Sequence, residues 1–553
     1  MENHADPFPV RWDDAEEAQA MWLLDDVHSL HRVSHLDFAL RARPMLEGSD
    51  KAFALYGIPF KTAPKLVHGR IYQKIVVADL SAEELAGALK AADEAVRRAA
   101  AELASRWEKT WLPEIQAHLA ALTAFDLRGA AWPALLAHLE DAKRRFERLW
   151  EVHFELLQPI LVALSDFEEA YRDLFPDARP FDVYDLLAGF PNKTIEANIQ
   201  LWRLGRAAAD KPSVRAIIIE SEPAALASTL EQSPDGRALL AEIRRYLSTY
   251  GERNDNLCID APTWIEEPTP ALRGLREAIL RPNRDLAEEL PQQTRRRESR
   301  LGEVRAQLAS FPRPVVEEFE ALLKAAQAAT ILSEDHHFWI DCKVTYHARR
   351  VALEVGRRLS ERGAIQSPAD VFELTLEDVS ALDAPEAPSA DLHARVAERR
   401  AEAERYAAVA PPPFLGVPRP LPPMDSAVLK ASFKFSGNIM SPPGGQGELR
   451  GMPGSRGKVT GPARVVRAHA DADKLEPGEI LVAPATLPSW TPFFATAAAV
   501  VTGTGGILSH AAVVAREYGI PAVVGARGAP DVIRDGQIVE VDGDAGVVRL
   551  MAS

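Results

Sequence analysis

The sequence predicts a multidomain protein in which a mainly α-helical N-terminal region precedes a compact C-terminal α/β domain. With 553 residues, the chain is too long for one hydrophobic core, because domains usually hold roughly 100–200 residues. Apolar residues recur every three or four positions over 81–248 and 313–363, which is the period of amphipathic helices. After residue 452, short β-rich runs separated by turns replace this pattern.

The helical region is expected to span 1–381. The run SAEELAGALKAADEAVRRAAAELASRWEKTW shows the helical period most clearly, and the block 313–363 closes with basic residues and Gly363, which are typical of a helix end. GRIYQKIVV alternates more like a strand, so a small β element is possible near 53–80.

A change in composition marks a predicted linker at 382–451. AVAPPPFLGVPRPLPPM and SPPGGQGELRGMPGSRG are rich in proline and glycine, cannot continue a helix and should form a semi-rigid tether. One short helical stretch, DLHARVAERRAEAERYAA, interrupts them. We place the main domain boundary here and expect the C-terminal domain at 452–553.

Within the C-terminal domain a strand, a helix and a second strand follow one another. AAAVVT reads as a buried strand, SHAAVVAREYG as a helix and IPAVVG as the next strand. Ser509 is suited to cap the start of the helix and Gly519 its end, so His510 falls in the first helical turn. Unpaired backbone N–H groups and the positive end of the helix dipole stabilise a dianion there. A phosphorylated imidazole is such a group.

The string TGTGGILSHAAVVAREYGIPAVVG, preceded by ILVAPATLPSWTPFFATAAAVV and followed by DGQIVEVDGDAGVV, strongly resembles the swivelling phosphohistidine domain of the phosphoenolpyruvate-utilising enzymes. The resemblance covers nearly all of 452–550 and implies that His510 is the phosphorylated histidine. Leu508 stands where regulated dikinases carry a phosphorylated threonine, so that regulation is not expected. The resemblance also implies a supporting phosphate loop made of Thr502, Gly505, Gly506, Ser509 and Arg516.

Enzymes of this family usually begin with an ATP-grasp module, and the synthases and dikinases end with a pyruvate-binding barrel. Neither is visible in this sequence. We therefore expect a separate ATP-grasp subunit to bind ATP and Mg²⁺ and to phosphorylate His510, releasing AMP and phosphate. No cofactor is expected to bind tightly to this chain. This organisation resembles that of phenylphosphate synthases, whose phosphohistidine subunit phosphorylates a phenolic hydroxyl.

The first 380 residues resemble, more weakly, the helical acceptor domain of rifampin phosphotransferases. The resemblance rests on FPVRWDDAEEAQAMWLLDDVHSLHRVS, YGERNDNLCIDAPTWIEEP and EDHHFWIDCKVTYHARRVALEVGRRLSERGAIQSPADVFEL. Phosphoryl transfer to a hydroxyl needs a base and cations; the candidates for these roles are His336, His337 and Arg253. Candidates for acceptor binding are Trp22, His28, Glu252, Trp264, Trp339, Asp341 and Arg349.

The spacing of His28, His31 and His35 predicts that they share one face of a helix. A metal trio is possible on that spacing, but no carboxylate pattern completes a known signature, so we expect no metal site. Nine of the ten tryptophans precede the predicted linker, which suits either an aromatic acceptor pocket or an ordinary helical core.

Charge and composition exclude several classes of function. The 80 acidic and 64 basic side chains give a net charge of −16, which disfavours binding to nucleic acid or anionic lipid. No apolar run is long enough for a membrane span, and no targeting segment is evident. Cys258 and Cys342 are too few for a disulfide framework. We expect a cytoplasmic protein.

Two functional hypotheses follow. The first is a phosphotransferase subunit that moves a phosphoryl group from His510 to a small, aromatic hydroxyl compound. The second is a phosphohistidine relay or scaffold whose helical region binds a partner protein. A closed apolar pocket facing His510 would favour the first, and a flat helical surface the second. A degenerate carrier domain is a third reading, which the intact Gly-Gly and Ser-His pairs argue against.

Overall fold

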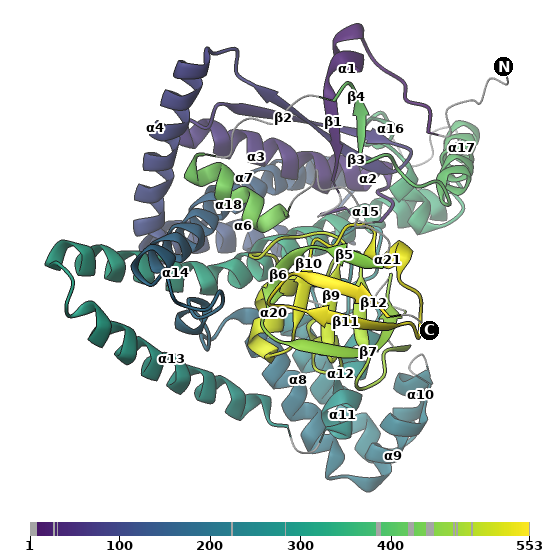
Figure 1. The fold of residues 1–553 in the computed structure, drawn as a ribbon. Helices are drawn as coiled ribbons and strands as arrows, with labels where there is room; N and C mark the ends of the chain where they lie inside the picture. Colours follow the sequence, from purple (N-terminus) through teal and green to yellow (C-terminus); the bar gives the residue numbers. More distant parts are fainter. Residues whose placement is uncertain are drawn as a thin grey trace.

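The fold is known from a computed structural model, drawn in Figure 1, and its two parts differ in architecture as the sequence predicts. Helices form most of the chain before residue 382, and a mixed sheet with short helices forms the C-terminal part, which confirms the predicted fold class. The structure describes residues 8–551 except 26–27, 30, 223–224, 282–283, 383–388, 419–424, 438–446, 468–470, 472–473 and 488–489.

The helical part is built around α7 (Trp132–Leu174), a helix of 43 residues. Its buried face packs between α3 and α14, and α18 and α4 also lie against it. The α-helices of this part besides α7 are α1 (Ala15–Gln19), α2 (His35–Asp37), α3 (Arg43–Tyr56), α4 (Ala82–Ala101), α5 (Leu103–Arg106), α6 (Leu112–Ala124), α8 (Lys193–Ala209), α9 (Pro212–Glu220), α10 (Leu226–Leu230), α11 (Pro234–Tyr250), α12 (Thr269–Leu280), α13 (Leu286–Leu308), α14 (Arg313–His336), α15 (Lys343–Glu361) and α16 (Leu376–Ser380).

Pro159 lies inside α7 without ending it. Proline has no N–H, so the carbonyl of Glu155 one turn earlier loses its usual helical partner. The hydroxyl of Tyr56, at the end of α3, donates a hydrogen bond to that carbonyl at 2.7 Å. A tertiary contact thus satisfies the freed backbone group and holds α3 against α7.

One long helix changes its winding in the middle. α14 runs directly into a π-helical turn, η5 (His337–Cys342), and then into α15. Such turns insert a residue and rotate the side chains that follow, and they occur often at functional sites. Two further π-helical turns are η1 (Phe38–Ala42) and η2 (Trp107–Trp111), and the short 3₁₀ turns are η3 (Tyr184–Leu186) and η6 (Pro368–Glu373).

A four-stranded antiparallel sheet in the order β2-β3-β1-β4 covers one end of the helical part. The predicted β element near 53–80 contributes two of its strands. The strands are β1 (Met21–Leu24), β2 (Phe60–Val67), β3 (Arg70–Val77) and β4 (Phe414–Gly416).

The predicted helical face of His28, His31 and His35 does not form. Of these three only His35, the first residue of α2, is helical. Strand pairing outweighs the local spacing here, because β1 is hydrogen-bonded to both β3 and β4. The N–H of Val33 also donates to the carbonyl of Gly69 in the β2–β3 turn at 2.8 Å.

The predicted tether over 382–451 is too broad, because much of it packs on the helical part. It contains α17 (Ser389–Tyr406), strand β4 and α18 (Ala427–Ser436). The carboxylate of Asp93 in α4 accepts hydrogen bonds from the first N–H groups of α18, those of Ala427 and Val428, at 2.8 and 3.0 Å. A distant residue thereby starts a helix that the local composition does not reveal. Residues 383–388, 419–424 and 438–446 of the predicted tether lie outside the described residues.

The C-terminal domain is an eight-stranded mixed sheet in the order β5-β12-β11-β7-β8-β9-β10-β6. β7, β8, β9 and β10 run parallel at its centre, and antiparallel strands flank them. The strands are β5 (Glu448–Arg450), β6 (Met452–Ser455), β7 (Lys458–Val465), β8 (Ile480–Ala483), β9 (Ala499–Thr502), β10 (Ala522–Val524), β11 (Ile538–Asp542) and β12 (Val547–Leu550), and the helices are α19 (Thr491–Phe494), α20 (His510–Tyr518) and α21 (Ala529–Val532).

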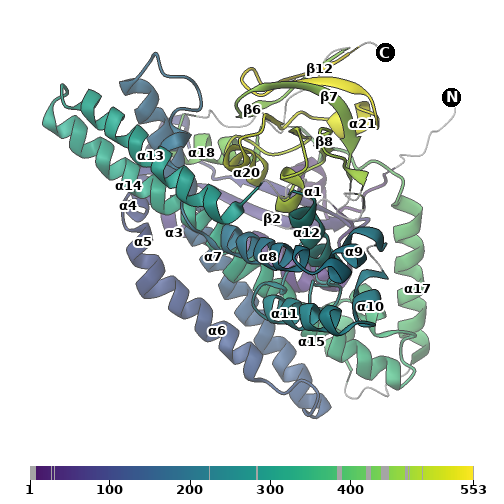
Figure 2. The ribbon, with the colours of Figure 1, turned by 90° about the horizontal axis from the view of Figure 1, so that it is seen from below.

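The C-terminal domain sits on the helical part with α20 on its inner side (Figure 2). Among the polar contacts that join the two, Arg456 donates to Asp185 at 2.8 Å and Thr496 to Glu277 at 2.8 Å. The side-chain amide of Gln293 in α13 also donates to the carbonyl of Glu517 at 2.6 Å.

Two findings bear on the exclusions made from composition. Both cysteines, Cys258 and Cys342, are buried free thiols. In the part of the chain that the structure describes, none of the helices combines the length and the apolar character that crossing a bilayer requires.

The close packing of α3 on α7 predicts unequal effects of two glycine-to-alanine substitutions. A Cβ at Gly48 in α3 would lie 2.7 Å from the backbone carbonyl carbon of Trp150, whereas one at Gly87 in α4 would meet nothing within 4 Å. We expect Gly48→Ala to destabilise the protein by about 1–3 kcal/mol through overpacking. Gly87→Ala should stabilise it by about 0.5–1 kcal/mol through helix propensity. Thermal unfolding of both variants measures the difference, and equal midpoints would contradict the packing described.

Candidate active site

His510 is the first residue of α20, at the end of a loop that leaves the sheet. Parallel strands β9 and β10 flank this helix in the sequence, so the chain makes the predicted strand–helix–strand crossover. Ser509 is the N-cap residue and Gly519, with a φ of 66°, ends the helix. The hydroxyl of Ser509 caps no backbone N–H and has no hydrogen-bond partner among the described residues. The helix start therefore keeps a polar group available beside His510.

The two glycines before His510 are required by the backbone. Gly505 has a φ of +91°, a conformation that other residues rarely adopt. A Cβ at Gly506 would lie 2.2 Å from the carbonyl oxygen of Lys434 in α18. The N–H groups of Gly506 and Leu508 donate to the carbonyls of Phe435 and Lys434 at 2.8 and 2.9 Å. In this arrangement Gly506 of the predicted phosphate loop allows α18 to approach.

The imidazole of His510 is held between two threonines and a phenylalanine. Its Nδ1 lies 3.2 Å from the hydroxyl oxygen of Thr486, and its Nε2 lies 3.4 Å from that of Thr491. The ring of Phe494 meets it edge-on, with 6.1 Å between centroids. Burial lowers the pKa of His510 to about 4, and the nearby Glu334 only partly offsets this effect. At neutral pH the ring is uncharged and can act as a nucleophile.

A cavity of about 150 Å³ lies between His510 and the helical part. One wall is apolar and comes from α7, with Leu157, Ile160, Leu161 and Leu164. The opposite wall is the loop of Gly505 and Ser509 together with His510. The phosphohistidine candidate therefore faces a cavity that the helical part also lines.

Four imidazoles, those of His28, His153, His336 and His337, and the carboxylate of Asp341 line the helical side of this cavity. Asp341 accepts a hydrogen bond from Nδ1 of His153 and another from Nδ1 of His337, each at 2.8 Å. Although burial acts to raise it, these two contacts hold the pKa of Asp341 well below its usual range. Burial acts to lower the pKa of His337, but Cys342 and Asp341 hold it well above 6.5.

His336 and His28 complete the polar end. Nδ1 of His336 lies 2.6 Å from the carbonyl oxygen of Leu332, and burial, with His153 nearby, lowers the pKa of His336 to about 4. His28 faces the cavity as well and pairs with Asp25 at 3.3 Å. Of the residues predicted for the acceptor site, the structure brings together His28, His336, His337 and Asp341.

The three predicted tryptophans lie away from the cavity lining. Trp22 is a core residue of the N-terminal sheet, where Lys65 and Lys74 lie over its ring. Trp264 packs among α8–α12 and donates from its indole N–H to Asp255 at 3.0 Å. Trp339, in η5, is half-buried against Phe338.

Three predicted charged residues also belong to other contacts. The guanidinium of Arg253 lies 5.4 Å from the ring centroid of Trp264. Glu252 pairs with Lys343 at 2.6 Å, and Arg349 pairs with Glu266 at 2.8 Å. Each side chain supports the fold around the cavity without lining it.

The remaining residues of the predicted phosphate loop, Thr502 and Arg516, bind backbone groups of the loop that leads to His510. Thr502, the last residue of β9, donates to the carbonyl of Thr504 at 2.8 Å and so shapes the loop. Arg516 donates to the carbonyl of Ile507 at 3.0 Å and lies over the ring of Tyr184 in the helical part at 4.0 Å. Burial raises the pKa of the adjacent Glu517 to about 8, with the charge of Glu334 adding to the effect.

The sequence analysis did not single out His153, Glu334, Thr486 and Thr491. The two threonines stand in the string PATLPSWT, which is part of the resemblance to the phosphohistidine domain, so that signal was present. His153 lies in the middle of α7 without a local motif, and only the packing of α7 against α14 places it here.

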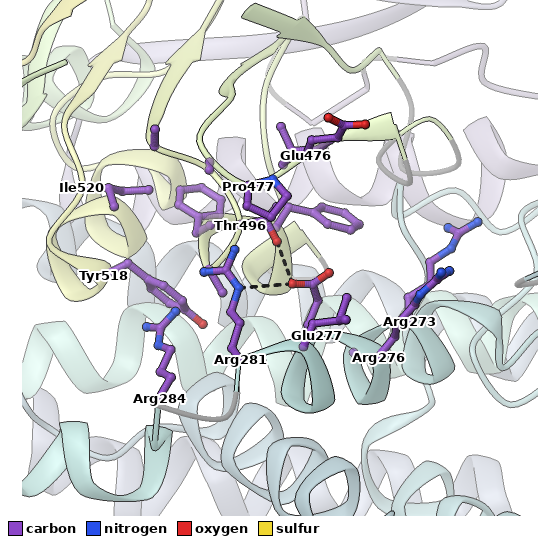
Figure 3. Close-up of a pocket in the computed structure, with 18 of the residues that line it drawn as sticks. Arg273, Arg276, Glu277, Arg281, Arg284, Glu476, Pro477, Thr496, Tyr518 and Ile520 are labelled. Carbon is purple, nitrogen blue, oxygen red and sulfur yellow. Dashed lines mark hydrogen bonds and ion pairs between the residues drawn. The ribbon is translucent and has the colours of Figure 1, made fainter. Parts of the chain in front are cut away.

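A second cavity, of about 680 Å³, lies between α12 and the C-terminal domain. Figure 3 shows Arg281 beside Glu277, which also binds Thr496, while Arg284 stands by Tyr518. His510 is not part of its lining, although Phe494 lines this cavity and also contacts His510. The larger cavity is therefore separate from the reacting group, and the smaller one carries the candidate chemistry.

Comparison with protein families assigns two parts of the chain. Residues 475–546 match the PEP-utilising enzyme, mobile domain, and residues 156–334 match the rifampicin phosphotransferase fourth domain. The first match contains His510 and its loop. The second contains the C-terminal part of α7 and most of α14, which contribute to the helical side of the smaller cavity.

Relatives extend this similarity along most of the chain. Chondramide synthase of Chondromyces crocatus is 45% identical over 553 residues, which cover 98% of this chain and 14% of that protein. An uncharacterized phosphotransferase of Bacillus subtilis, YvkC, is 30% identical over 75% of this chain and 49% of its own length. A rifampicin phosphotransferase of Streptomyces sviceus is 29% identical over 79% of this chain and 49% of its own length.

The chain spans about half, or less, of the length of these relatives. The similarity nevertheless reaches both walls of the cavity. The chain thus joins a mobile domain of the PEP-utilising enzymes to a domain of the rifampicin phosphotransferase type, and it is homologous to the rifampicin phosphotransferases over most of its length.

Proposed function

We propose that this chain is a phosphotransferase subunit in which His510 carries a phosphoryl group to the hydroxyl of a small phenolic acceptor. The observation that carries the proposal is the position of the His510 imidazole, at the start of α20 and lining a cavity that the helical part also lines. Backbone N–H groups at a helix start stabilise the negative charge of a phosphoryl group. The match to the mobile domain of PEP-utilising enzymes supports the same role.

The proposed transfer needs no reactant besides phosphorylated His510 and the acceptor hydroxyl. The P–N bond to His510 breaks, and a P–O bond to the acceptor oxygen forms. The hydroxyl proton passes to the imidazole nitrogen that releases the phosphoryl group. A phenol, with a pKa of about 10, loses its proton more readily than an alkanol does. The low pKa of His510 suits it to leave as a neutral imidazole.

The size of the cavity supports an acceptor with a single aromatic ring. A cavity of about 150 Å³ walled by aliphatic side chains is the size that holds one benzene ring. The walls from α7 are apolar, and the polar groups gather at one end. This is the arrangement expected for a ligand with an apolar body and one hydroxyl. A macrocycle such as rifampicin would not fit while the two parts are docked.

The donor in this proposal is ATP bound with Mg²⁺ to a separate ATP-grasp subunit, as in the phenylphosphate synthases that the sequence resembles. The β-phosphoryl group passes to His510, and water takes the γ-phosphoryl group, so that AMP and phosphate leave. Access to that partner requires the C-terminal domain to leave the helical part. The side-chain contacts of Arg456, Gln293 and Thr496 and the backbone hydrogen bonds from Gly506 and Leu508 to α18 would then be exchanged for contacts with water.

A phosphohistidine relay that acts on a partner protein is the competing function. It would need His510 to be presented to a broad surface. In the docked arrangement His510 faces a cavity of about 150 Å³ lined by α7 and the end of α14, and this concave site favours a small acceptor over a broad protein surface.

The first prediction concerns the protonation of His510. Because burial depresses its pKa to about 4, the docked ring stays neutral as the pH falls from 6.5, and it charges only near 4. Among the groups around it, Glu334 acts to raise this pKa and His337 to lower it. Between pH 6.5 and pH 4 an undocked His510 would already be charged, whereas the docked ring is still neutral. The contribution of His510 to docking therefore weakens as the pH falls through this range. Nitrogen NMR of the full chain with labelled histidine measures the midpoint, and His510→Gln identifies the signal. A midpoint near 6.5 would contradict the buried position.

The second prediction concerns phosphorylation. β-labelled ATP with an ATP-grasp subunit should place acid-labile label on the wild type and on His118→Gln, a variant of a half-buried histidine in α6. His510→Ala should take none. Phosphoramidate, which phosphorylates imidazoles directly, should label the same residue without a partner.

Label that persists on His510→Ala would overturn the carrier role. If phosphoramidate labels His510 but ATP with the ATP-grasp subunit does not, only the proposed donor would be wrong, since the histidine would still be reactive.

The third prediction concerns the acceptor. Leu161, in the apolar wall, is 4% exposed, and Leu161→Phe should fill part of the cavity. Transfer from phosphorylated His510 to phenol should fall roughly tenfold or more, since a small misplacement of reactants costs that much. Phosphorylation of His510 by phosphoramidate should not change. Leu136→Phe, on the same helix outside the cavity lining, is the control. Undiminished transfer in Leu161→Phe would place the acceptor elsewhere.

A further inference from the structure

Three buried side chains from separate elements meet on the acceptor side of the cavity. They are His153 of α7, His336 at the end of α14 and Asp341 of η5, and they are 4%, 6% and 6% exposed. One nitrogen or oxygen of each lies within 4.8 Å of those of the other two. The phosphotransfer proposed above gives this group no role.

The hydrogen bond of His336 fixes which of its nitrogens is free. A carbonyl oxygen can only accept, so the Nδ1 that lies 2.6 Å from the carbonyl of Leu332 carries the proton. Nε2 then holds a lone pair, and in the part of the chain that the structure describes no hydrogen-bond donor reaches it. A histidine anchored through one nitrogen to a backbone carbonyl is the usual arrangement of a metal ligand.

His153 and Asp341 are in direct contact with each other. Nδ1 of His153 and Oδ1 of Asp341 are 2.8 Å apart. Two ligand atoms of one tetrahedral metal lie roughly 3.3 Å apart for bonds of about 2.0–2.1 Å. The second oxygen of Asp341 accepts from Nδ1 of His337 at 2.8 Å, which orients the carboxylate. A supporting partner that orients a ligand is typical of built metal sites.

The π-helical turn η5 provides this arrangement. It begins one residue after His336 and includes Asp341. The altered winding sets the side chain of Asp341 toward both His337 and His153 of α7. A turn of this kind is less stable than regular helix, and its occurrence next to the cavity is the pattern found at functional sites.

We propose that His153, His336 and Asp341 bind a divalent cation of the zinc and manganese class. Two imidazoles and one carboxylate are the donor set of catalytic sites for such metals, with positions left open for substrate. On binding, the metal accepts the lone pairs of two nitrogens and a carboxylate oxygen. The proton now on Nδ1 of His153 leaves through water, and the imidazole stays neutral with its proton on Nε2.

The role of the cation rests on the proposed function. It would lie on the helical side of the cavity that His510 also lines, where it would neutralise the oxygens of the transferring phosphoryl group and lower the pKa of a coordinated hydroxyl. His336 then serves as a metal ligand, and the sequence-based proposal that it is the acceptor base is replaced.

Cobalt binding tests the site without any phosphotransfer. The full chain, freed of metal, is titrated with Co²⁺, and we expect visible absorption bands that saturate at one equivalent and disappear when Zn²⁺ is added. Mg²⁺ should not displace cobalt. His336→Gln should weaken binding roughly tenfold or more, and His118→Gln should not change it. His336→Cys should add a near-ultraviolet charge-transfer band, because a thiolate then contacts the metal.

Thermal unfolding separates loss of a ligand from loss of the fold. If His336→Gln remains folded and binds cobalt as the wild type does, or if His336→Cys gives no charge-transfer band, the three side chains form only a hydrogen-bonded network and the proposal is overturned. Cobalt binding in His510→Ala should be intact. Failure to phosphorylate His510 would thus leave the metal site standing, and absence of cobalt binding would leave the carrier role standing.

Discussion

The imidazole of His510 is half-buried, and this partial removal from water is the constraint on which the rest of the site depends. His510 reaches its cavity only when the C-terminal domain is docked, and burial there keeps its ring neutral near pH 7. A phosphorylated ring would bring two negative charges into the same space, beside Glu334 and Asp341. Burying such charge without partners costs several kcal/mol or more. The docked phosphorylated state therefore requires positive charge on the helical side, and the start of α20 alone supplies only part of it.

Under the proposed function, the interface between the C-terminal domain and the helical part has to form and to break in each cycle. α18 belongs to the helical part, since Asp93 caps its start and Lys434 pairs with Glu169 at 3.1 Å. Its last carbonyls accept hydrogen bonds from Gly506 and Leu508 in the loop before His510. Backbone hydrogen bonds are directional and individually worth about 0.5–1.5 kcal/mol. They place the loop accurately when docked, yet a few of them can be exchanged for water when the domain leaves.

Local patterns in the sequence were sufficient for the phosphohistidine side of the site but not for the acceptor side. Ser509, His510 and Gly519 lie within one short helix, so capping preferences alone locate them. The acceptor side joins α7, α14 and η5, and no local rule relates His153 to residues nearly two hundred positions away. The two wrong predictions, the helical face of His28, His31 and His35 and the extent of the tether, have the same origin. Pairing of β1 and capping by Asp93 are both long-range contacts, and each changed a segment whose local composition suggested something else.

The small size of the cavity relates the proposed phosphotransfer to the docking of the C-terminal domain on the helical part. A phosphohistidine exposed to water is open to hydrolysis, and an enclosed site prevents such side reactions. The apolar wall from α7 and the close approach of Gly506 to α18 leave room for about one ring. A small acceptor can stay inside while the domain closes over it, whereas a large one would hold the domain away and expose the P–N bond. Under the proposed function, selectivity for a small acceptor and protection of the phosphoryl group are therefore consequences of the same docking.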